Sequence, residues 1–360
     1  GGQFLMSPGG QFLMSLDSKM VIPRCWFPDE TLYSLCGRHH RLSANTRPVD
    51  TYRELFGEPR GKRPDSFGKR LASFAQKARG ELGTPIDIIL SHTVFPFYLW
   101  LVPGSAANAI LDSFQDVPTR WSCESLILGT GGFGLKHPLR ACGSCMRQDV
   151  EEFGVAYWHL AHQFPGVTLC LRHGVLLDRV RSDVVVGSGS SWLLPRLEVL
   201  EAPQNNNDVD VEAGAVASHI ACAIGTFGSR ARLNPMVTRA TYLLAYHRRG
   251  LLKANSMQLC RLEVARQFAP FCSSLGGYAD YSDLLHVGAV RLAINSVSLY
   301  RRQTNPIWHV PTIAWAFGSW RTFTNAYFAM RLAKRLPAPL QTLVGAGASA
   351  CSPLRRGGLS

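Results

Sequence analysis

Four side chains that commonly bind metal stand in two closely spaced pairs in the middle of the chain. Cys142 and Cys145 form a C-x2-C pair, and Cys170 and His173 form a C-x2-H pair. A gap of two residues lets a tight turn aim both side chains of a pair at one ion, and three thiolates with one imidazole complete the tetrahedral shell of a structural zinc site. The set leaves no position open for water, which argues against metal-assisted hydrolysis. The pattern therefore predicts one structural Zn²⁺.

The two pairs could instead be unrelated, with Cys142 and Cys145 forming a redox C-x-x-C. No β-α-β pattern surrounds Cys142, however, and the second pair has a zinc-type spacing of its own. Between the pairs, His159 and His162 have the spacing of a further metal-binding pair. Because four better ligands flank them, we expect these two histidines to pack beside the centre and to hydrogen-bond its ligands.

A longer pattern of motifs surrounds the ligands. Its segments are DVEEFGVAYWHLAHQFPGV at 149–167, CLRHGVLL at 170–177, FPDE at 27–30, LYS at 32–34, RELFG at 53–57 and HTVFPFY at 92–98. Together they closely resemble the TniQ/TnsD family of transposition targeting proteins, over about residues 25–180. The resemblance is nearer to the TnsD branch than to the shorter, CRISPR-linked TniQ proteins.

The resemblance implies a function in target selection. Proteins of this family recognise an insertion site and recruit an AAA+ ATPase regulator, which brings in the transposase. This chain departs from the family pattern at Gly143 and Leu171, where proline commonly follows the cysteine. Neither change removes a ligand, although proline would have stiffened each turn. Three alternatives stay open: an adaptor of a CRISPR effector complex, a zinc-containing transcription regulator, and a metal-dependent nuclease, which would need an open metal position.

Basic residues are concentrated in the last part of the chain. The net charge is +13, of which residues 1–150 carry +4, residues 151–215 carry −5 and residues 216–360 carry +14. Fifteen of the seventeen basic residues in the last segment are arginine, whose planar guanidinium suits phosphate and guanine edges. A field of this sign favours nucleic acid, so we expect contacts with target-site duplex DNA. The residues expected to make them are Arg230, Arg232, Arg239, Arg248, Arg249, Lys253, Arg301 and Arg302.

The overall composition is that of a globular protein. At 360 residues, with 46% hydrophobic and 18% charged residues, the chain should form two or three domains. Its ten cysteines do not suggest a disulfide scaffold in a chain this long. The longest strongly apolar run, residues 94–102, falls short of the roughly 18 residues that a membrane span needs, so we expect no membrane partner.

The first residues repeat, with GGQFLMS at 1–7 and again at 9–15, and lack the basic start of a signal peptide. We therefore expect a bacterial cytoplasmic protein that associates with the nucleoid.

Apolar periodicity and breaker residues predict a mainly α-helical fold. We expect a helix-turn-helix-like N-terminal region at 20–135, a small zinc-binding module at 136–200, a linker at 201–212 and an Arg-rich helical DNA-binding domain at 213–336. Residues 1–19, an added or upstream segment, and the tail at 337–360 are expected to be disordered. A first helix is expected to begin with Asp29 as its N-cap. Further helices are expected at 51–56, 84–90, 106–114, 216–224, 236–249, 257–271 and 285–302.

Signatures of an enzyme are missing from the sequence. It has no nucleophile elbow, no Walker motif and no paired carboxylates in its acid-poor C-terminal half. The glycine-rich stretch at 129–134 lacks the Lys-Ser/Thr of a phosphate-binding loop and is expected to be a connector. We therefore expect a non-enzymatic adaptor. Because the family motifs are densest where the net charge is low, we expect the ATPase to contact residues 20–200 and DNA to contact residues 213–336.

Overall fold

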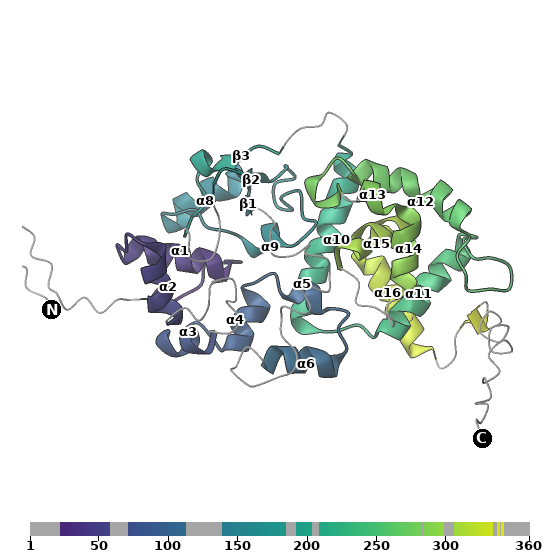
Figure 1. Cartoon of the computed structure of the whole chain (residues 1–360), viewed down its shortest axis with the longest axis horizontal. Helices are drawn as coiled ribbons and strands as arrows, with labels where there is room; N and C mark the ends of the chain where they lie inside the picture. The colour runs from purple at the N-terminus through teal and green to yellow at the C-terminus, as the bar shows by residue number, and fades with distance from the viewer. Residues whose placement is uncertain are drawn as a thin grey trace, which may run out of the picture.

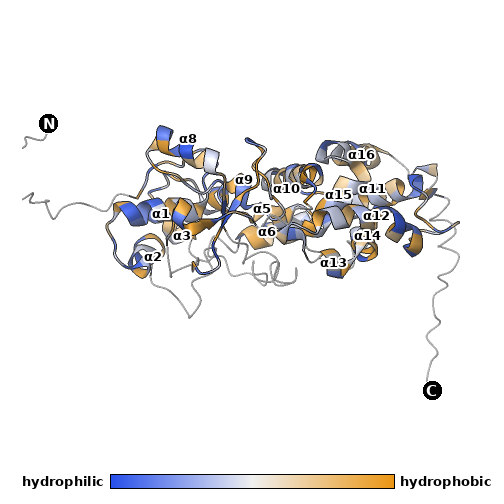
Figure 2. Cartoon of the chain, turned by 90° about the horizontal axis from the view of Figure 1, so that it is seen from above, coloured by the Kyte–Doolittle hydropathy of each residue, from blue (hydrophilic) through white to orange (hydrophobic). Residues whose placement is uncertain are grey.

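The structure, a computed structural model, is mainly helical, as the sequence predicts. It describes residues 22–57, 71–112, 139–184, 192–203, 209–282, 284–298, 306–333, 337–338 and 340–341. The described helices form a long body, with α1, α2 and α3 at one end and α11, α12, α14 and α16 at the other (Figures 1 and 2). The glycine-rich stretch at 129–134 and the segment at 1–19 lie outside the described residues.

The described residues of the N-terminal part form six short helices. They are α1 (Leu32–Leu42), α2 (Pro48–Phe56), α3 (Leu71–Lys77), α4 (Pro85–Ser91), α5 (Pro96–Leu99) and α6 (Gly104–Asp112). The helix-turn-helix character expected of this part stays a prediction. Helix α4 begins as expected, because the Thr84 side chain accepts from the Asp87 N–H in a reciprocal capping box.

The predicted N-cap of α1 is wrong. Thr31 caps this helix, with its hydroxyl accepting from the Ser34 N–H at 3.1 Å. Asp29 instead has a φ of 59° and accepts from the Ala161 N–H at 3.0 Å. A partner 132 residues away therefore decides the role of Asp29. Helix α2 also begins earlier than expected, since Pro48 occupies its first turn, where a missing N–H costs nothing.

The middle of the chain has little regular structure. Its elements are β1 (Arg140–Ala141), α8 (Gly143–Phe153), α9 (Leu160–Gln163), β2 (Asp178–Val180), the 3-10 helix η3 (Leu197–Val199) and β3 (Leu200–Glu201). The three strands form one antiparallel sheet in the order β1-β2-β3. Helix α8 lies at the surface and carries mostly hydrophilic residues (Figure 2).

The C-terminal part is a bundle of helices. They are α10 (Val211–Arg230), α11 (Pro235–Arg248), α12 (Arg261–Leu275), α13 (Leu284–Val287), α14 (Ala289–Val297), α15 (His309–Phe317) and α16 (Trp320–Leu332), with 3-10 turns η4 (Ala279–Tyr281) and η5 (Pro306–Trp308). The single helix expected at 285–302 is wrong: Gly288, with a φ of 75°, separates α13 from α14. This left-handed conformation is open to glycine at no steric cost.

One apolar core joins the middle and C-terminal parts. It contains Cys142, Cys145 and Cys170 together with side chains from α5, α10, α12, α14, α15 and α16. A second cluster fills the N-terminal helices and includes Trp192. Side chains on both sides of the expected linker at 201–212 therefore share a core, and the division into domains stays a prediction. Leu340, inside the expected disordered tail, is 1% exposed and packs with Leu243 and Met330.

Helix α10 is the central element of this core. By length and composition alone it could cross a membrane, but half of its apolar window is buried inside the fold. It packs against α5, α12, α15 and α16, as Figure 1 shows from its central position. A Cβ added at Gly228 would lie 2.0 Å from the Pro96 carbonyl oxygen, so glycine is what lets α5 approach α10 this closely.

Replacing Gly228 with alanine should therefore destabilise the protein. We expect the free energy of unfolding to fall by about 1–3 kcal/mol, because the α5 backbone must move away. Urea denaturation measures this change. The control is Gly104→Ala, where an added Cβ meets no atom within 4 Å. Equal stability of the two variants would contradict the close approach of α5 and α10.

Candidate metal centre

The first ligand pair lies at the start of α8. Cys142 is the N-cap residue of this helix and Cys145 lies in its first turn, with the Met146 N–H donating to the Cys142 carbonyl oxygen at 2.9 Å. Helical geometry therefore turns both thiols toward the same side. The positive end of the helix dipole lies beside them, which favours the thiolate form that binds metal.

The second pair lies in a tight turn. The Cys170 N–H donates to the Val175 carbonyl oxygen, and the Gly174 N–H donates to the Cys170 carbonyl oxygen, both at 2.8 Å. Gly174 has a φ of 67°, which glycine adopts freely and other residues rarely do. This turn places the side chains of Cys170 and His173 on the side that faces α8.

The four side chains meet as the sequence predicts. Their ligand atoms all lie within 4.8 Å of one another. The His173 Nδ1 is 3.5 Å from the Cys142 Sγ, 3.4 Å from the Cys145 Sγ and 3.5 Å from the Cys170 Sγ. The two sulfurs of Cys145 and Cys170 are 3.7 Å apart. A tetrahedral zinc with bonds of about 2.3 Å to sulfur and about 2.0 Å to nitrogen separates its ligand atoms by roughly 3.5–3.8 Å, so the group fits this ion.

The thiols also need a positive charge beside them. Burial raises the pKa of Cys142, and the hydrogen bond to Cys170 together with burial raises the pKa of Cys145. The hydrogen bond from Cys145 lowers the pKa of Cys170, so one thiolate forms readily while the other two thiols resist ionisation. A bound metal reverses this effect and deprotonates the thiols that coordinate it. Zinc would supply this charge and hold α8 against the Cys170–His173 turn.

The two histidines between the pairs lie beside the centre. The His162 Nε2 is 3.9 Å from the Cys145 Sγ, within reach of an N–H···S hydrogen bond to the thiolate. The His159 Nε2 lies 3.0 and 3.1 Å from the two carboxylate oxygens of Asp149 on α8. Both side chains thus connect to α8, His162 through a ligand and His159 through a buried carboxylate.

The N-terminal motif packs directly on the segment that carries these histidines. The Thr31 N–H donates to the Trp158 carbonyl oxygen at 3.0 Å, and the Leu160 N–H donates to the Asp29 carbonyl oxygen at 2.6 Å. The Tyr157 hydroxyl donates to the Pro28 carbonyl oxygen at 2.9 Å. The FPDE motif at 27–30 and the Tyr157–His159 stretch of the longer motif at 149–167 therefore contact each other directly.

A buried ion pair stabilises the N-terminal side of this contact. The Arg38 guanidinium donates to both carboxylate oxygens of Glu30, at 2.8 and 2.7 Å, and to the Cys25 carbonyl oxygen. It also lies 3.7 Å from the centre of the Phe27 ring. Glu30 is fully buried, so this bidentate pair and its extra hydrogen bond compensate the cost of desolvation.

A second buried ion pair, which the sequence did not indicate, joins the sheet to the C-terminal helices. The Arg140 guanidinium donates to the Asp280 carboxylate at 2.6 Å and to the carbonyl oxygens of Gln163 and Phe164. The same carboxylate accepts from the Gly166 N–H at 2.7 Å. Because 140 residues separate the two partners, no local pattern could have revealed the pair.

The basic residues predicted to bind DNA divide into two groups. Arg230, Arg248 and Lys253 are exposed, and their side chains make no ion pair or hydrogen bond with the described residues. The other described members donate to backbone carbonyl oxygens. Arg232 donates to those of Gly228 and Ala231, Arg239 to that of Val297, and Arg249 to those of Trp315 and Ala316. Arg301 and Arg302 lie outside the described residues, and DNA contact by any of the eight stays a prediction.

The fold and the site define a mainly helical protein with a closed Cys₃His group at its centre. A profile of the TniQ family matches residues 26–177. The matched segment begins one residue before the FPDE motif and contains all four ligand side chains. The chain is therefore similar to the TniQ family over this segment. No curated protein matches the chain.

The purified protein should contain about one zinc ion per chain, since the four ligands form one closed site. Replacing Cys170 with serine should release the metal and lower the free energy of unfolding by about 4 kcal/mol or more, because metal binding contributes directly to folding. Elemental analysis and denaturation measure the two effects. The control is Cys25→Ser, since Cys25 is exposed and lies outside the group. A Cys170→Ser variant that kept its zinc would contradict this assignment.

Proposed function

We propose that this protein is a target-selection adaptor of the TnsD branch of the TniQ family. It binds target-site duplex DNA and recruits an AAA+ ATPase regulator, which brings in the transposase. The observation that carries the proposal is the match to the TniQ family, because the matched residues include all four side chains of the closed metal group. A closed group offers no position for substrate or water, so the metal stabilises the fold and the protein acts by binding.

DNA contact is assigned to the exposed basic residues of the C-terminal part. Arg230 is the last residue of α10, Arg248 is the last residue of α11, and Lys253 follows in the next loop. Because no described side chain pairs with them, their charges are available to phosphate oxygens, which receive most protein hydrogen bonds in DNA complexes.

The combined substitution of Arg230, Arg248 and Lys253 by glutamine should weaken binding to duplex DNA. The dependence of affinity on salt should become shallower by about one unit of slope per lost phosphate contact, because fewer counterions are released. Titrations at several salt concentrations measure the slope.

The matched control removes the same charge from the other end of the molecule, at the exposed residues Arg47, Arg53 and Arg181. This control should leave the salt slope unchanged. Equal effects of the two triple variants would mean that net charge alone, and no particular surface, holds the DNA. A sequence-specific footprint made by the protein alone would also exclude an adaptor that depends on a guide-RNA complex.

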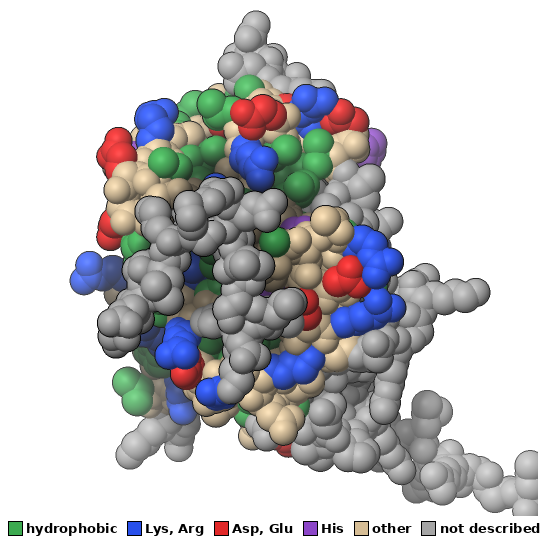
Figure 3. All heavy atoms as spheres, turned by 90° about the vertical axis from the view of Figure 1, so that its left-hand side faces the viewer, with side chains coloured by type: hydrophobic (Ala, Val, Ile, Leu, Met, Phe, Trp, Pro, Cys, Tyr) green, Lys and Arg blue, Asp and Glu red, His purple; other side chains and the backbone are tan. Residues whose placement is uncertain are grey.

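The ATPase is assigned to a groove beside α8. The groove has a volume of about 530 Å³ and includes Met146 and Leu194 in its lining. Two apolar side chains at its border, Val150 and Leu197, are 52% and 72% exposed. On the N-terminal end of the molecule, apolar side chains lie among charged ones of both signs (Figure 3). Apolar side chains within a polar rim are typical of protein interfaces.

Replacing both Val150 and Leu197 with glutamate should reduce capture of the cognate ATPase by about tenfold or more, because two charges would enter an apolar contact. Zinc content and DNA affinity should not change. The control is Leu262→Glu on α12, where the side chain is 81% exposed. Pull-down with the full chain measures capture, since the shared core makes isolated halves unsuitable. Undiminished capture by the double variant would contradict this surface.

A further inference from the structure

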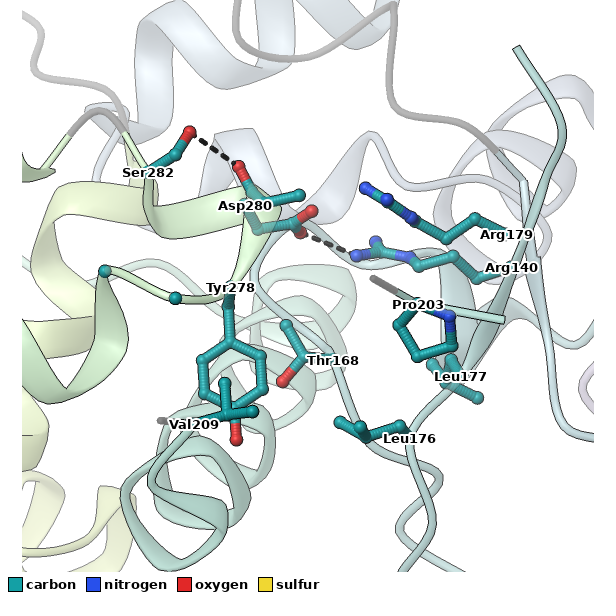
Figure 4. Close-up of a pocket in the computed structure, with 13 residues that line it drawn as sticks. Arg140, Thr168, Leu176, Leu177, Arg179, Pro203, Val209, Tyr278, Asp280 and Ser282 are labelled. Atoms are coloured by element: carbon teal, nitrogen blue, oxygen red, sulfur yellow. Dashed lines mark hydrogen bonds and ion pairs between the residues drawn. The ribbon is translucent and has the colours of Figure 1, made fainter. Parts of the chain in front are cut away.

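A cavity of about 350 Å³ lies between the small sheet and the turn that follows α12. Figure 4 shows Arg140 and Arg179 extending from the sheet on one side, with Tyr278 and Asp280 on the other. Neither the metal group nor the proposed DNA and ATPase surfaces use this cavity. Its lining combines charged groups with apolar side chains such as Leu177.

Strand register brings two positive charges together at this cavity. Arg140 on β1 lies directly opposite Arg179 on β2. Directly opposite residues project from the same face of a sheet with about 5 Å between their Cβ atoms, and like charges there are destabilising. Some negative charge must therefore compensate each guanidinium.

Only one of the two guanidinium groups makes an ion pair with the described residues. Arg140, 2% exposed, is paired with the Asp280 carboxylate. The Arg179 side chain makes no hydrogen bond or ion pair within the described part of the chain, and its Nε is buried without a partner. Glu201 lies opposite Arg179 on β3, yet no hydrogen bond or ion pair joins these two side chains.

We propose that this cavity binds a small molecule carrying a phosphate group, which the Arg179 guanidinium holds through paired hydrogen bonds. Arginine presents parallel N–H donors that match the oxygens of phosphate. Such an anion would satisfy the buried Nε and offset the repulsion between Arg140 and Arg179. Tyr278 and Leu176, in the wall beyond the arginines, would contact the apolar body of the ligand.

The size of the cavity favours a small molecule over the backbone of DNA. Its volume lies within the range of about 300–1,000 Å³ that is usual for small-ligand pockets. A duplex would need an open, extended surface, and Arg140 within the cavity is almost fully buried. The exposed basic side chains assigned to DNA lie on other elements, with Arg230 at the end of α10 and Arg248 at the end of α11.

The test uses the zinc-loaded full chain and three probes: inorganic phosphate, adenosine monophosphate and a DNA duplex. Thermal unfolding and calorimetric titration are recorded at constant ionic strength set with chloride. We expect both small phosphates to stabilise the protein, with tighter binding of the nucleotide. Arg179→Gln should weaken this binding roughly tenfold or more. The control Arg181→Gln, which alters an exposed arginine on the same strand end paired with Asp183, should leave it unchanged.

Without a phosphate probe, Arg179→Gln should be at least as stable as the wild type, because it removes a half-buried guanidinium whose buried Nε has no partner. A purely structural arginine would give the opposite result. Equal stabilisation of all three proteins by phosphate, or no stabilisation of the wild type, would overturn the proposal. The proposal would also be overturned if the DNA duplex raised the unfolding temperature in an Arg179-dependent way while the small phosphates did not. If Arg179→Gln loses phosphate binding but keeps its affinity for DNA, the cavity and the proposed DNA surface are separate sites. The cavity proposal can therefore fail without affecting the proposed function.

Discussion

The convergence of three thiols and one imidazole in the buried Cys₃His group is the constraint on which the middle of the fold depends. The three sulfurs are buried in the same apolar cluster as α10 and α12, and burial opposes their ionisation. The segment between the ligand pairs has only the four-residue helix α9 after α8, so backbone hydrogen bonding alone holds it weakly. A metal bound by this group would join α8 to the Cys170–His173 turn and fix this segment, together with the antiparallel bridge between Glu30 and His159.

Buried polar contacts connect the segments around the metal group to the N-terminal and C-terminal parts of the molecule. Toward the N-terminus, the Trp158 segment orders the loop before α1, where Glu30 and Arg38 form their ion pair. Toward the C-terminus, Arg140 precedes the first ligand pair and binds Asp280 beyond α12. Buried ion pairs add little net stability, but breaking one is costly. They therefore act chiefly to select one arrangement of segments that are distant in the sequence.

The features that could be predicted from the sequence are those set by near neighbours. The two ligand pairs can be recognised from their two-residue gaps. The start of α4 can be predicted from Thr84, and the start of α11 from Asn234 with Pro235. Long-range contacts decide the rest. Asp29 is a good local cap, yet the Ala161 N–H draws its carboxylate away and leaves Thr31 to cap α1. The three-stranded sheet was missed because strands of two or three residues carry no periodic signal.

Counting charges in the sequence does not distinguish exposed, unpaired basic residues from those that are already hydrogen-bonded within the fold. Arg232, Arg239 and Arg249 raise the net charge, yet each donates to backbone carbonyl oxygens at or near a helix end. Their charge still contributes to the long-range field that draws a polyanion toward the C-terminal part. Some of their five N–H donors are already used by these carbonyl oxygens, so fewer donors remain for a phosphate. Under the proposed function, electrostatic attraction and direct contact would therefore involve different arginines: many residues would govern how fast DNA arrives, and fewer would govern how firmly it is held.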